Sequence, residues 1–278
     1  MKTLINRIDL NMMSMATIIV LSNFIHNALQ GHLESNRLAR SGYALITSGC
    51  SISSNFPGNT LSAYLLKNQL DDGGWADVEE TIWCLAYLKA FGGRYKKEVV
   101  SGQQWLSSMQ LPSGAWGKSN RDIPRIPTTA LMVALVPEVA NPSTTKWIYD
   151  QWAADMESAT KLTYKGAFFL IAMAQNQASQ NKLIDHTINY LVSEQEDNGG
   201  FAPWKDHPIG SDPWSTGVVL WGLSAMGKSA PLHTIEKALS WLKSKQLPSG
   251  FWPYHYLDDA AAMVLVGISN ALNCLPEQ

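Results

Sequence analysis

The sequence predicts an all-α protein, an α/α barrel whose concentric inner and outer helices come from a repeat of about 42 residues. Three observations predict this fold class. One turn pattern recurs along the chain, and half-polar helices alternate between the turns with helices that are apolar nearly all round. Of the 278 residues, 46% are hydrophobic and 16% charged, which supplies one large core and excludes a disordered chain. We therefore expect a single domain over residues 1–278, with residues 1–57 closing the barrel and residues 58–273 forming five helix-pair repeats.

Charge and cysteine content narrow the class of protein further. The formal net charge is −2, so the broad basic surface of a nucleic-acid-binding protein is absent. The three cysteines, Cys50, Cys84 and Cys274, have no paired spacing, which argues against a disulfide framework or a zinc knuckle. These features predict a cytoplasmic protein in a reducing compartment.

The first helix is expected between Met12 and Leu29. This stretch is largely apolar but is interrupted by Asn23 and His26, and a membrane-spanning helix needs about 20 nearly uninterrupted apolar residues. A secretory signal peptide is the alternative, yet no clear small-residue cleavage site follows. We expect a buried amphipathic helix that ends at Gly31 and takes the sixth place in the inner layer.

The recurring turn reads Gln-x-x-x-Gly-x-aromatic, and another aromatic residue precedes each Gln by five positions. Those aromatics, with a degenerate copy at Trp147, recur at intervals of about 41 to 51 residues. Gly supplies backbone freedom at the turn, and Pro112 and Pro248 prevent the preceding helix from continuing. The four turns run from Gln69 to Trp75, Gln110 to Trp116, Gln195 to Phe201 and Gln246 to Trp252.

Two kinds of helix flank each turn. The helix before it is half-polar, as in Thr234 to Lys245, where Ile235, Ala238 and Leu242 recur at helical spacing. The helix after it has no polar face and must be buried on all sides. The apolar segments that predict the inner helices are residues 82–88, 130–135, 167–173, 218–223 and 260–268.

The repeat resembles the QW motif of squalene–hopene cyclases and related class II terpene cyclases, and looser forms occur in protein prenyltransferase β subunits. The match covers about residues 58–273. The resemblance implies an (α/α)6 barrel with the turns on the outside, where Gln caps a helix and Trp stacks beside it. It assigns a structural role to the Gln and Trp residues. This chain has room for one such barrel.

Because each turn leads into the start of an inner helix, we expect the N-termini of the inner helices to gather at one mouth, where loops carry function. Two acidic clusters there resemble the Asp-x-Asp-Asp motif of class II cyclases, in which the middle Asp protonates an alkene or epoxide. Asp258 and Asp259 match its last two carboxylates, with Tyr256 in place of the first Asp. Asp77, Glu79 and Glu80 keep all three carboxylates.

The acid proposed from this resemblance is Asp258, tuned by Asp259 and by His255 or Tyr256, with Glu79 and Asp77 as the second choice. Adjacent carboxylates in an apolar cavity cannot all ionise, so one stays protonated as a general acid requires. Simple helix capping is the alternative for both clusters and for Asp212.

Aromatic and basic side chains supply candidate substrate contacts. Ring faces stabilise carbocations, and basic groups can hold a diphosphate or carboxylate head group. Ordinary core packing and a solvated loop are the respective alternatives. The candidate substrate-binding residues are Trp214, Tyr254, Tyr164, Phe168, Trp83, Arg121, Arg125 and Asp212.

The function predicted from the sequence is a protonation-initiated cyclisation or isomerisation of an isoprenoid or similar alkene, without metal or cofactor. The expected partner is a small hydrophobic substrate, with an anionic head group as an option. One alternative is a non-catalytic barrel that binds a prenyl chain, lipid or peptide in a biosynthetic complex. Another is a zinc-dependent prenyltransferase-type subunit, which is disfavoured because Cys84 lacks an Asp-x-Cys or paired His. The sequence predicts no transmembrane segment and leaves oligomeric state and peripheral membrane contact open.

Overall fold

The computed structural model describes residues 7–30, 35–49, 58–159, 161–175 and 182–275, and every regular element in these ranges is helical. Gly31 and Cys50, named in the sequence analysis, lie outside these ranges. No helix among the described residues combines the length and apolarity needed to cross a bilayer.

The chain divides into two compact units. The N-terminal unit is Ser22–Trp152, and the C-terminal unit combines Met1–Leu21 with Ala153–Gln278. The boundaries fall inside two helices, α1 (Arg7–Ala28) and α7 (Pro142–Met156). The single domain predicted for residues 1–278 stays a prediction.

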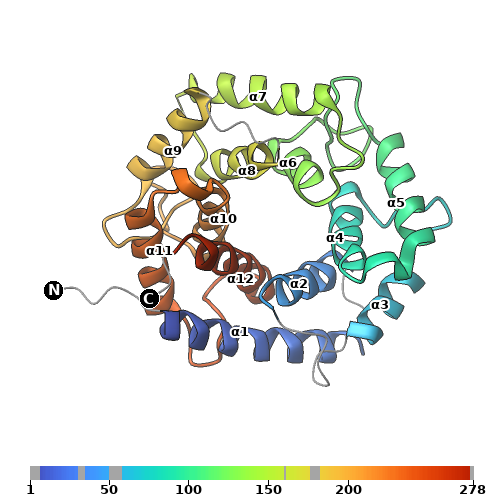
Figure 1. The fold of residues 1–278 in the computed structure, drawn as a ribbon, viewed down its shortest axis with the longest axis horizontal. Helices are drawn as coiled ribbons and strands as arrows, with labels where there is room; N and C mark the ends of the chain where they lie inside the picture. The colour runs from blue at the N-terminus through green and yellow to red at the C-terminus, as the bar shows by residue number, and fades with distance from the viewer. Residues whose placement is uncertain (1–6, 31–34, 50–57, 160, 176–181, 276–278) are drawn as a thin grey trace. The chain divides into compact units, whose positions relative to one another are not determined.

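The N-terminal unit has two layers of helices (Figure 1). The first layer holds α2 (Ser35–Thr47), α4 (Val78–Lys89) and α6 (Ile126–Leu135), with α4 packed against both neighbours. The second layer holds α3 (Gly58–Lys67), which packs on α2, and α5 (Lys96–Ser108), which packs on α4. A short 3-10 helix, η1 (Gly92–Tyr95), leads into α5. The apolar segments expected to form inner helices at residues 82–88 and 130–135 lie in α4 and α6, and their side chains are almost all buried.

The C-terminal unit repeats this arrangement (Figure 1). Helices α8 (Thr163–Ala174), α10 (Pro213–Ser224) and α12 (Leu257–Cys274) lie side by side. Helix α9 (Lys182–Glu194) covers α8, and α11 (Leu232–Lys245) covers α10. A second 3-10 helix, η2 (Gly227–Ser229), precedes α11.

Glycines allow α10 and α12 to pack closely. A Cβ atom added to Gly217 would lie 2.7 Å from the backbone nitrogen of Val264, and one added to Gly267 would lie 2.5 Å from the carbonyl oxygen of Gly217. Any side chain at either position would therefore push the helices apart. This close packing holds the first turns of α10 and α12 next to each other.

The first helix differs from the prediction. Met12 is 68% exposed and Met15 57% exposed on α1, whereas Leu10 and Leu21 are fully buried, so this helix buries one face only and does not belong to the first layer. Within the C-terminal unit, its backbone at Met13 and its Thr17 hydroxyl instead contact the turn that follows α11, in the way the second-layer helices contact the other turns. The first-layer helix that packs beside α4 on the N-terminal side of the sequence is α2. High apolar content suggested a place in the inner layer, but Met12, Met15 and Ile19 are exposed.

The Gln residues of the four turns bind backbone as the resemblance implies. Gln110 Nε2 donates to the Gly114 carbonyl at 2.8 Å and to Thr144 Oγ1 on α7 at 3.2 Å, so one side chain joins its own turn to the next second-layer helix. The indole Nε1 of Trp116 donates to the Leu106 carbonyl at 2.7 Å. The corresponding Gln contacts recur at Gln69, Gln195 and Gln246, and the indole bond recurs at Trp75 and Trp252. These residues are structural, and the turns fix where the first-layer helices start.

Candidate functional site

The first turns of α8, α10 and α12 come together in the C-terminal unit. At the centre lies Trp214 at the start of α10, whose Nε1 donates to Asp259 Oδ1 on α12 at 3.0 Å. The Tyr164 ring of α8 meets the Trp214 ring edge-on, with centroids 5.9 Å apart, and the centroid of the Phe168 ring lies 6.4 Å from that of Trp214. The structure therefore brings four predicted site residues from three helices into one cluster, which we call the Trp214 cluster.

The two carboxyl groups of α12 differ in exposure. Asp258 is only 3% exposed, whereas Asp259 is half-buried. The N-cap position of α12 belongs to Tyr256, which makes no side-chain cap bond, and both aspartates lie in the first turn of the helix. The buried Asp258 is thus next in sequence to the aspartate whose carboxyl accepts the indole N–H.

Asp212 serves as a helix cap. Its Oδ1 accepts the Ser215 backbone N–H at 2.8 Å and its Oδ2 accepts the Ser215 hydroxyl at 2.7 Å, so both oxygens are engaged at the N-terminus of α10. Burial raises the pKa of Asp212 above its usual value, and it outweighs the opposing effect of the hydrogen bonds from Ser215. The substrate-binding role predicted for Asp212 has no support in these contacts.

Three predicted residues precede α12 and contact one another. The Tyr254 and His255 ring centroids are 4.1 Å apart, and those of His255 and Tyr256 are 4.9 Å apart. Tyr256 is 52% exposed, and His255 is also exposed. These rings form a series at the surface, next to the buried Asp258 in sequence.

The second acidic cluster lies in the N-terminal unit at the start of α4. Asp77 caps this helix, because its Oδ1 accepts the Glu80 backbone N–H at 2.8 Å. Glu79 lies 3.9 Å from the guanidinium of Arg40 on α2. An ion pair favours the ionised form of a carboxyl group, whereas a proton donor must be protonated. The contact with Arg40 therefore disfavours Glu79 as the general acid. Glu80 is buried at 9% exposure.

Trp83, predicted to contact substrate, is 1% exposed and packs between helices. Its ring meets Tyr43 of α2 edge-on at 5.8 Å, and the Arg40 guanidinium lies 5.9 Å from its centroid. Sequence reasoning did not identify Arg40 or Tyr43, because neither belongs to a repeated motif. The only indication in the sequence was the position of Arg40, a charged residue on the apolar side of α2.

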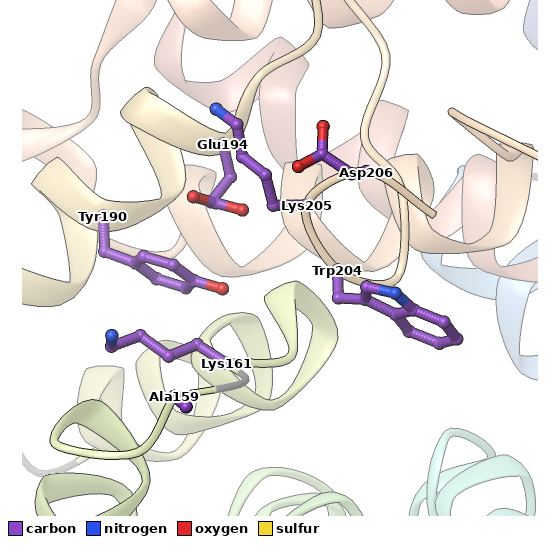
Figure 2. Close-up of a pocket in the computed structure, with 7 residues that line it drawn as sticks. All are labelled: Ala159, Lys161, Tyr190, Glu194, Trp204, Lys205 and Asp206. Atoms are coloured by element: carbon purple, nitrogen blue, oxygen red, sulfur yellow. The ribbon is translucent and has the colours of Figure 1, made fainter. Parts of the chain in front are cut away.

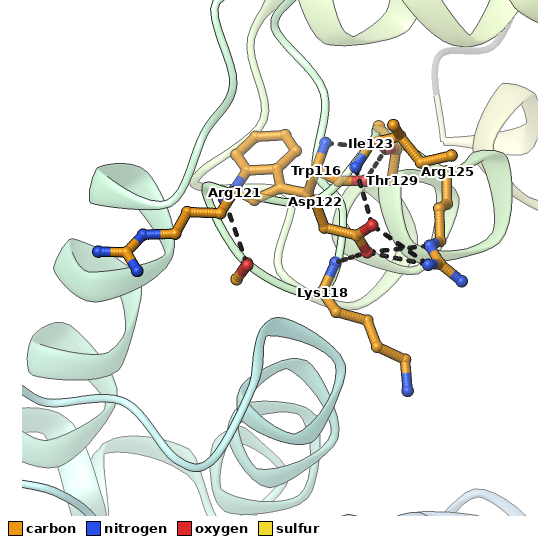
Figure 3. Close-up of polar contacts among 8 residues, drawn as sticks. Trp116, Lys118, Arg121, Asp122, Ile123, Arg125 and Thr129 are labelled. Carbon is orange, nitrogen blue, oxygen red and sulfur yellow. Dashed lines mark hydrogen bonds and ion pairs between the residues drawn. The ribbon is translucent and has the colours of Figure 1, made fainter.

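The two predicted arginines of the basic loop behave differently. Arg125 is paired with Asp122, whose Oδ2 accepts from the arginine Nε at 3.1 Å and lies 3.0 Å from Nη2. The same carboxylate accepts the backbone N–H groups of Lys118 and Ile123, and the first of these bonds is the largest cause of the lowered pKa of Asp122. Figure 3 shows the Arg121 side chain pointing away from this pair. Of the two predicted arginines, Arg125 is thus the one that pairs with Asp122, and the guanidinium of Arg121 extends away from that pair.

Among the described residues, no group of three or more His, Cys, Asp or Glu side chains is placed to hold a metal ion. Cys84 is buried within α4, and burial raises the pKa of its thiol well above the usual value.

Comparison with solved structures identifies the fold. A substituted variant of the type II terpene cyclase MstE from Scytonema, solved with the substrate geranylgeranyl dihydroxybenzoate, matches 96% of this chain and 99% of its own, with 16% identity and a TM-score of 0.72. The ent-copalyl diphosphate synthase of Streptomyces platensis matches 84% of this chain and 50% of its own, at 14% identity and a TM-score of 0.60. A possible member of the GH105 family from Klebsiella pneumoniae matches 98% of this chain and 95% of its own, at 12% identity and a TM-score of 0.66.

These likenesses confirm the predicted fold class, the all-α barrel of helix-pair repeats found in terpene cyclases. They do not fix the reaction, because unrelated chemistries share one fold. A search of curated proteins found no match. Residues 83–262 match the family model of the squalene-hopene cyclase C-terminal domain. The chain therefore belongs to the squalene-hopene cyclase C-terminal domain family.

Proposed function

We propose that this protein is a class II terpene cyclase-like enzyme that protonates an alkene of an isoprenoid and guides the resulting carbocation to a cyclised or isomerised product. The observation that carries the proposal is the Trp214 cluster, which sets the Asp259 carboxyl, next in sequence to the buried Asp258, against three aromatic rings. MstE, which has the same fold, takes a geranylgeranyl-bearing substrate.

In this proposal Asp258 gives the proton. The Trp214 N–H bond to Asp259 Oδ1 favours the ionised form of Asp259, because hydrogen bonding to a carboxylate stabilises the charge. Asp258, the more buried of the two aspartates, is the proposed donor. The exposed His255 and Tyr256 rings border this carboxyl in sequence and form the proposed route by which it regains a proton from solvent.

The chemistry balances without a cofactor. Proton transfer from Asp258 to one carbon of a double bond leaves a carbocation on the other carbon, and the π electrons of a second double bond close a ring. Loss of a proton from the final cation forms a new double bond, so the net reaction is an isomerisation. The faces of Trp214, Tyr164 and Phe168 stabilise the cation by about 0.5–2 kcal/mol each when water is excluded.

Isosteric substitution tests the acid. With geranylgeranyl dihydroxybenzoate and geranylgeranyl diphosphate as substrates, Asp258→Asn should abolish product formation while binding of the same prenyl ligands, measured calorimetrically, is retained. Glu79→Gln is the matched control, and it should keep turnover because Glu79 is paired with Arg40. Turnover that survives in Asp258→Asn would refute the assignment. Loss of turnover in Glu79→Gln alone would assign the proton donor to the acidic cluster at the start of α4 instead.

The non-catalytic binding alternative has a separate outcome. It requires that the wild-type protein bind these prenyl ligands and return them unchanged. Formation of any cyclised product by the wild type excludes it.

A further inference from the structure

A pocket with a volume of about 400 Å³ lies in the C-terminal unit, between the α7–α8 connection, the end of α9 and residues 204–206 (Figure 2). Small-molecule sites usually have volumes of about 300–1,000 Å³. None of its lining residues belongs to the Trp214 cluster. The hydroxyl of Tyr190 and the carboxyl of Glu194 point toward the same space (Figure 2).

The pocket coincides with the degenerate repeat. In α5 and α11, the aromatic residue five positions before Gln covers the second glycine of the preceding turn: a Cβ on Gly74 would lie 2.4 Å from the Trp105 ring, and one on Gly200 would lie 2.7 Å from the Trp241 ring. Tyr190 holds this position in α9, but the repeat before it has no Gln-x-x-x-Gly-x-aromatic turn. Its ring therefore lines a pocket where its counterparts pack on backbone.

The charges around the pocket are not equivalent. Lys161 and Lys205 bring two ammonium groups, and Glu194 and Asp206 bring two carboxyls. Burial raises the pKa of Glu194, and this effect exceeds the opposing effect of the two lysines. Protonation of Glu194 leaves two ammonium groups and one other carboxyl around the pocket, so the pocket becomes net positive. Burial also raises the pKa of Tyr190, so its hydroxyl stays a neutral donor.

We propose that this pocket binds a small organic carboxylate with a flat apolar body. Lys161 and Lys205 would hold the ligand carboxylate, because ammonium groups form charge-assisted hydrogen bonds with it. The rings of Tyr190 and of Trp204, which is 37% exposed, would border the flat body. Nothing in the proposed cyclisation uses these residues, so this site is separate from the reaction.

Binding at this site is coupled to a proton. An anion next to Glu194 disfavours its charged form, so the ligand and a proton bind together and affinity rises as the pH falls through the pKa of Glu194. The charged and titratable groups that face Glu194 are Lys161 from the α7–α8 connection, Lys205 and Asp206 from the loop after the turn, and Tyr190 and Glu196 from α9 and its end. Protonated Glu194 can itself donate to the ligand carboxylate.

Benzoate is a suitable probe, and isothermal titration or ligand-observed NMR measures its dissociation constant. Lys161→Met and Lys205→Met should each weaken benzoate binding about threefold or more, as expected for a partly exposed charge contact. Lys228→Met removes the same charge from η2, outside the pocket, and should leave the dissociation constant unchanged. Benzamide, which has the same shape without the charge, and cyclohexanecarboxylate, which lacks the flat ring, should both bind more weakly.

Glu194→Gln gives the sharper result. The neutral amide removes the repulsion and keeps a donor, so benzoate should bind more tightly at pH 8 than to the wild type and lose most of its pH dependence. Equal benzoate affinity in the wild type, Lys161→Met and Lys205→Met would overturn the proposal, as would unchanged pH dependence in Glu194→Gln. Tighter binding of benzamide than of benzoate would contradict the proposal that the ligand is an anion. A thermal unfolding curve confirms that each variant is folded.

Discussion

The indole Nε1 of Trp214 donates a hydrogen bond to Oδ1 of Asp259 at 3.0 Å, across 45 residues of sequence. This bond joins the first turns of α10 and α12 and orients one carboxyl of the pair that we assign to proton transfer. The same indole carries the edge contact with Tyr164. Trp214 therefore connects Asp259, the neighbour of the proposed acid Asp258, to the proposed cation-stabilising rings.

Trp214→Phe should lower kcat about ten- to a hundredfold, since a hydrogen bond to a charged group contributes roughly 1.5–3 kcal/mol. The apolar ring remains, so prenyl binding should change little. Trp221→Phe on the same helix is the control, because that residue is 7% exposed and its loss affects packing alone. Steady-state kinetics separates kcat from KM. An equal loss of turnover in both variants would reduce Trp214 to a packing role.

Asp212 gives a pH-dependent stability effect. Its folded-state pKa is raised by burial, so its ionisation disfavours the native state, and this penalty grows as the pH rises from the unfolded-state value through the folded-state value. Asp212→Asn keeps an acceptor for the Ser215 N–H but cannot ionise. The stability of Asp212→Asn relative to the wild type should therefore be greater at pH 7 than at pH 4. Urea denaturation at the two pH values measures this difference in the free energy of unfolding.

The control for this prediction is Asp212→Ala, which removes the cap and should cost about 0.5–2 kcal/mol at both pH values. A stability advantage of Asp212→Asn over the wild type that shrinks with rising pH would contradict the predicted direction.

The glycine under Trp105 has a steric role. Gly74→Ala would place a Cβ 2.4 Å from an indole ring whose Nε1 is held by Asp72 Oδ2 at 2.9 Å. We expect a loss of about 1–3 kcal/mol in unfolding free energy from this overpacking. Gly93→Ala is the matched control, since its Cβ would meet no atom within 4 Å. Similar stability for both variants in chemical denaturation would show that the ring moves aside without cost.

Arg121 and Arg125 are separable by substitution. Arg121→Met should weaken binding of geranylgeranyl diphosphate more than that of uncharged geranylgeraniol, because this guanidinium extends away from the loop (Figure 3). Arg125→Met should mainly destabilise the loop that Asp122 organises. Binding titrations with the two ligands and thermal unfolding distinguish the effects. An unchanged preference in Arg121→Met would remove its head-group role.

Sequence periodicity was sufficient to predict the turns and the layer of each repeat helix. The repeat pattern did not predict one further repeated contact. Three threonines, Thr81, Thr129 and Thr216, each lie four residues after the N-cap of a first-layer helix. The hydroxyl of each accepts a hydrogen bond from the backbone N–H of the aromatic residue in the preceding turn. Aligning the repeats by helix start would have revealed it. The first helix was misassigned because apolar content does not show which face a helix buries.

The candidate site was predictable only in its residue types. Placement at the start of a first-layer helix follows from the turn pattern, and three of the residues named on that basis, Trp214, Tyr164 and Asp259, contact one another in the structure. Which carboxyl meets an indole and which meets an arginine depends on the rotation of each helix about its axis. The repeat pattern does not encode that rotation, so the bond to Trp214 and the Arg40–Glu79 pair emerge only from the three-dimensional structure.

Incubation in D2O tests the central claim most directly. If Asp258 begins the reaction by protonating an alkene, the product formed from a prenyl substrate in D2O should gain one deuterium at the carbon that was protonated, as seen by mass spectrometry and NMR, and Asp258→Asn should form none of it. A product without deuterium, or a deuterated product that Asp258→Asn forms at the wild-type rate, would contradict the account.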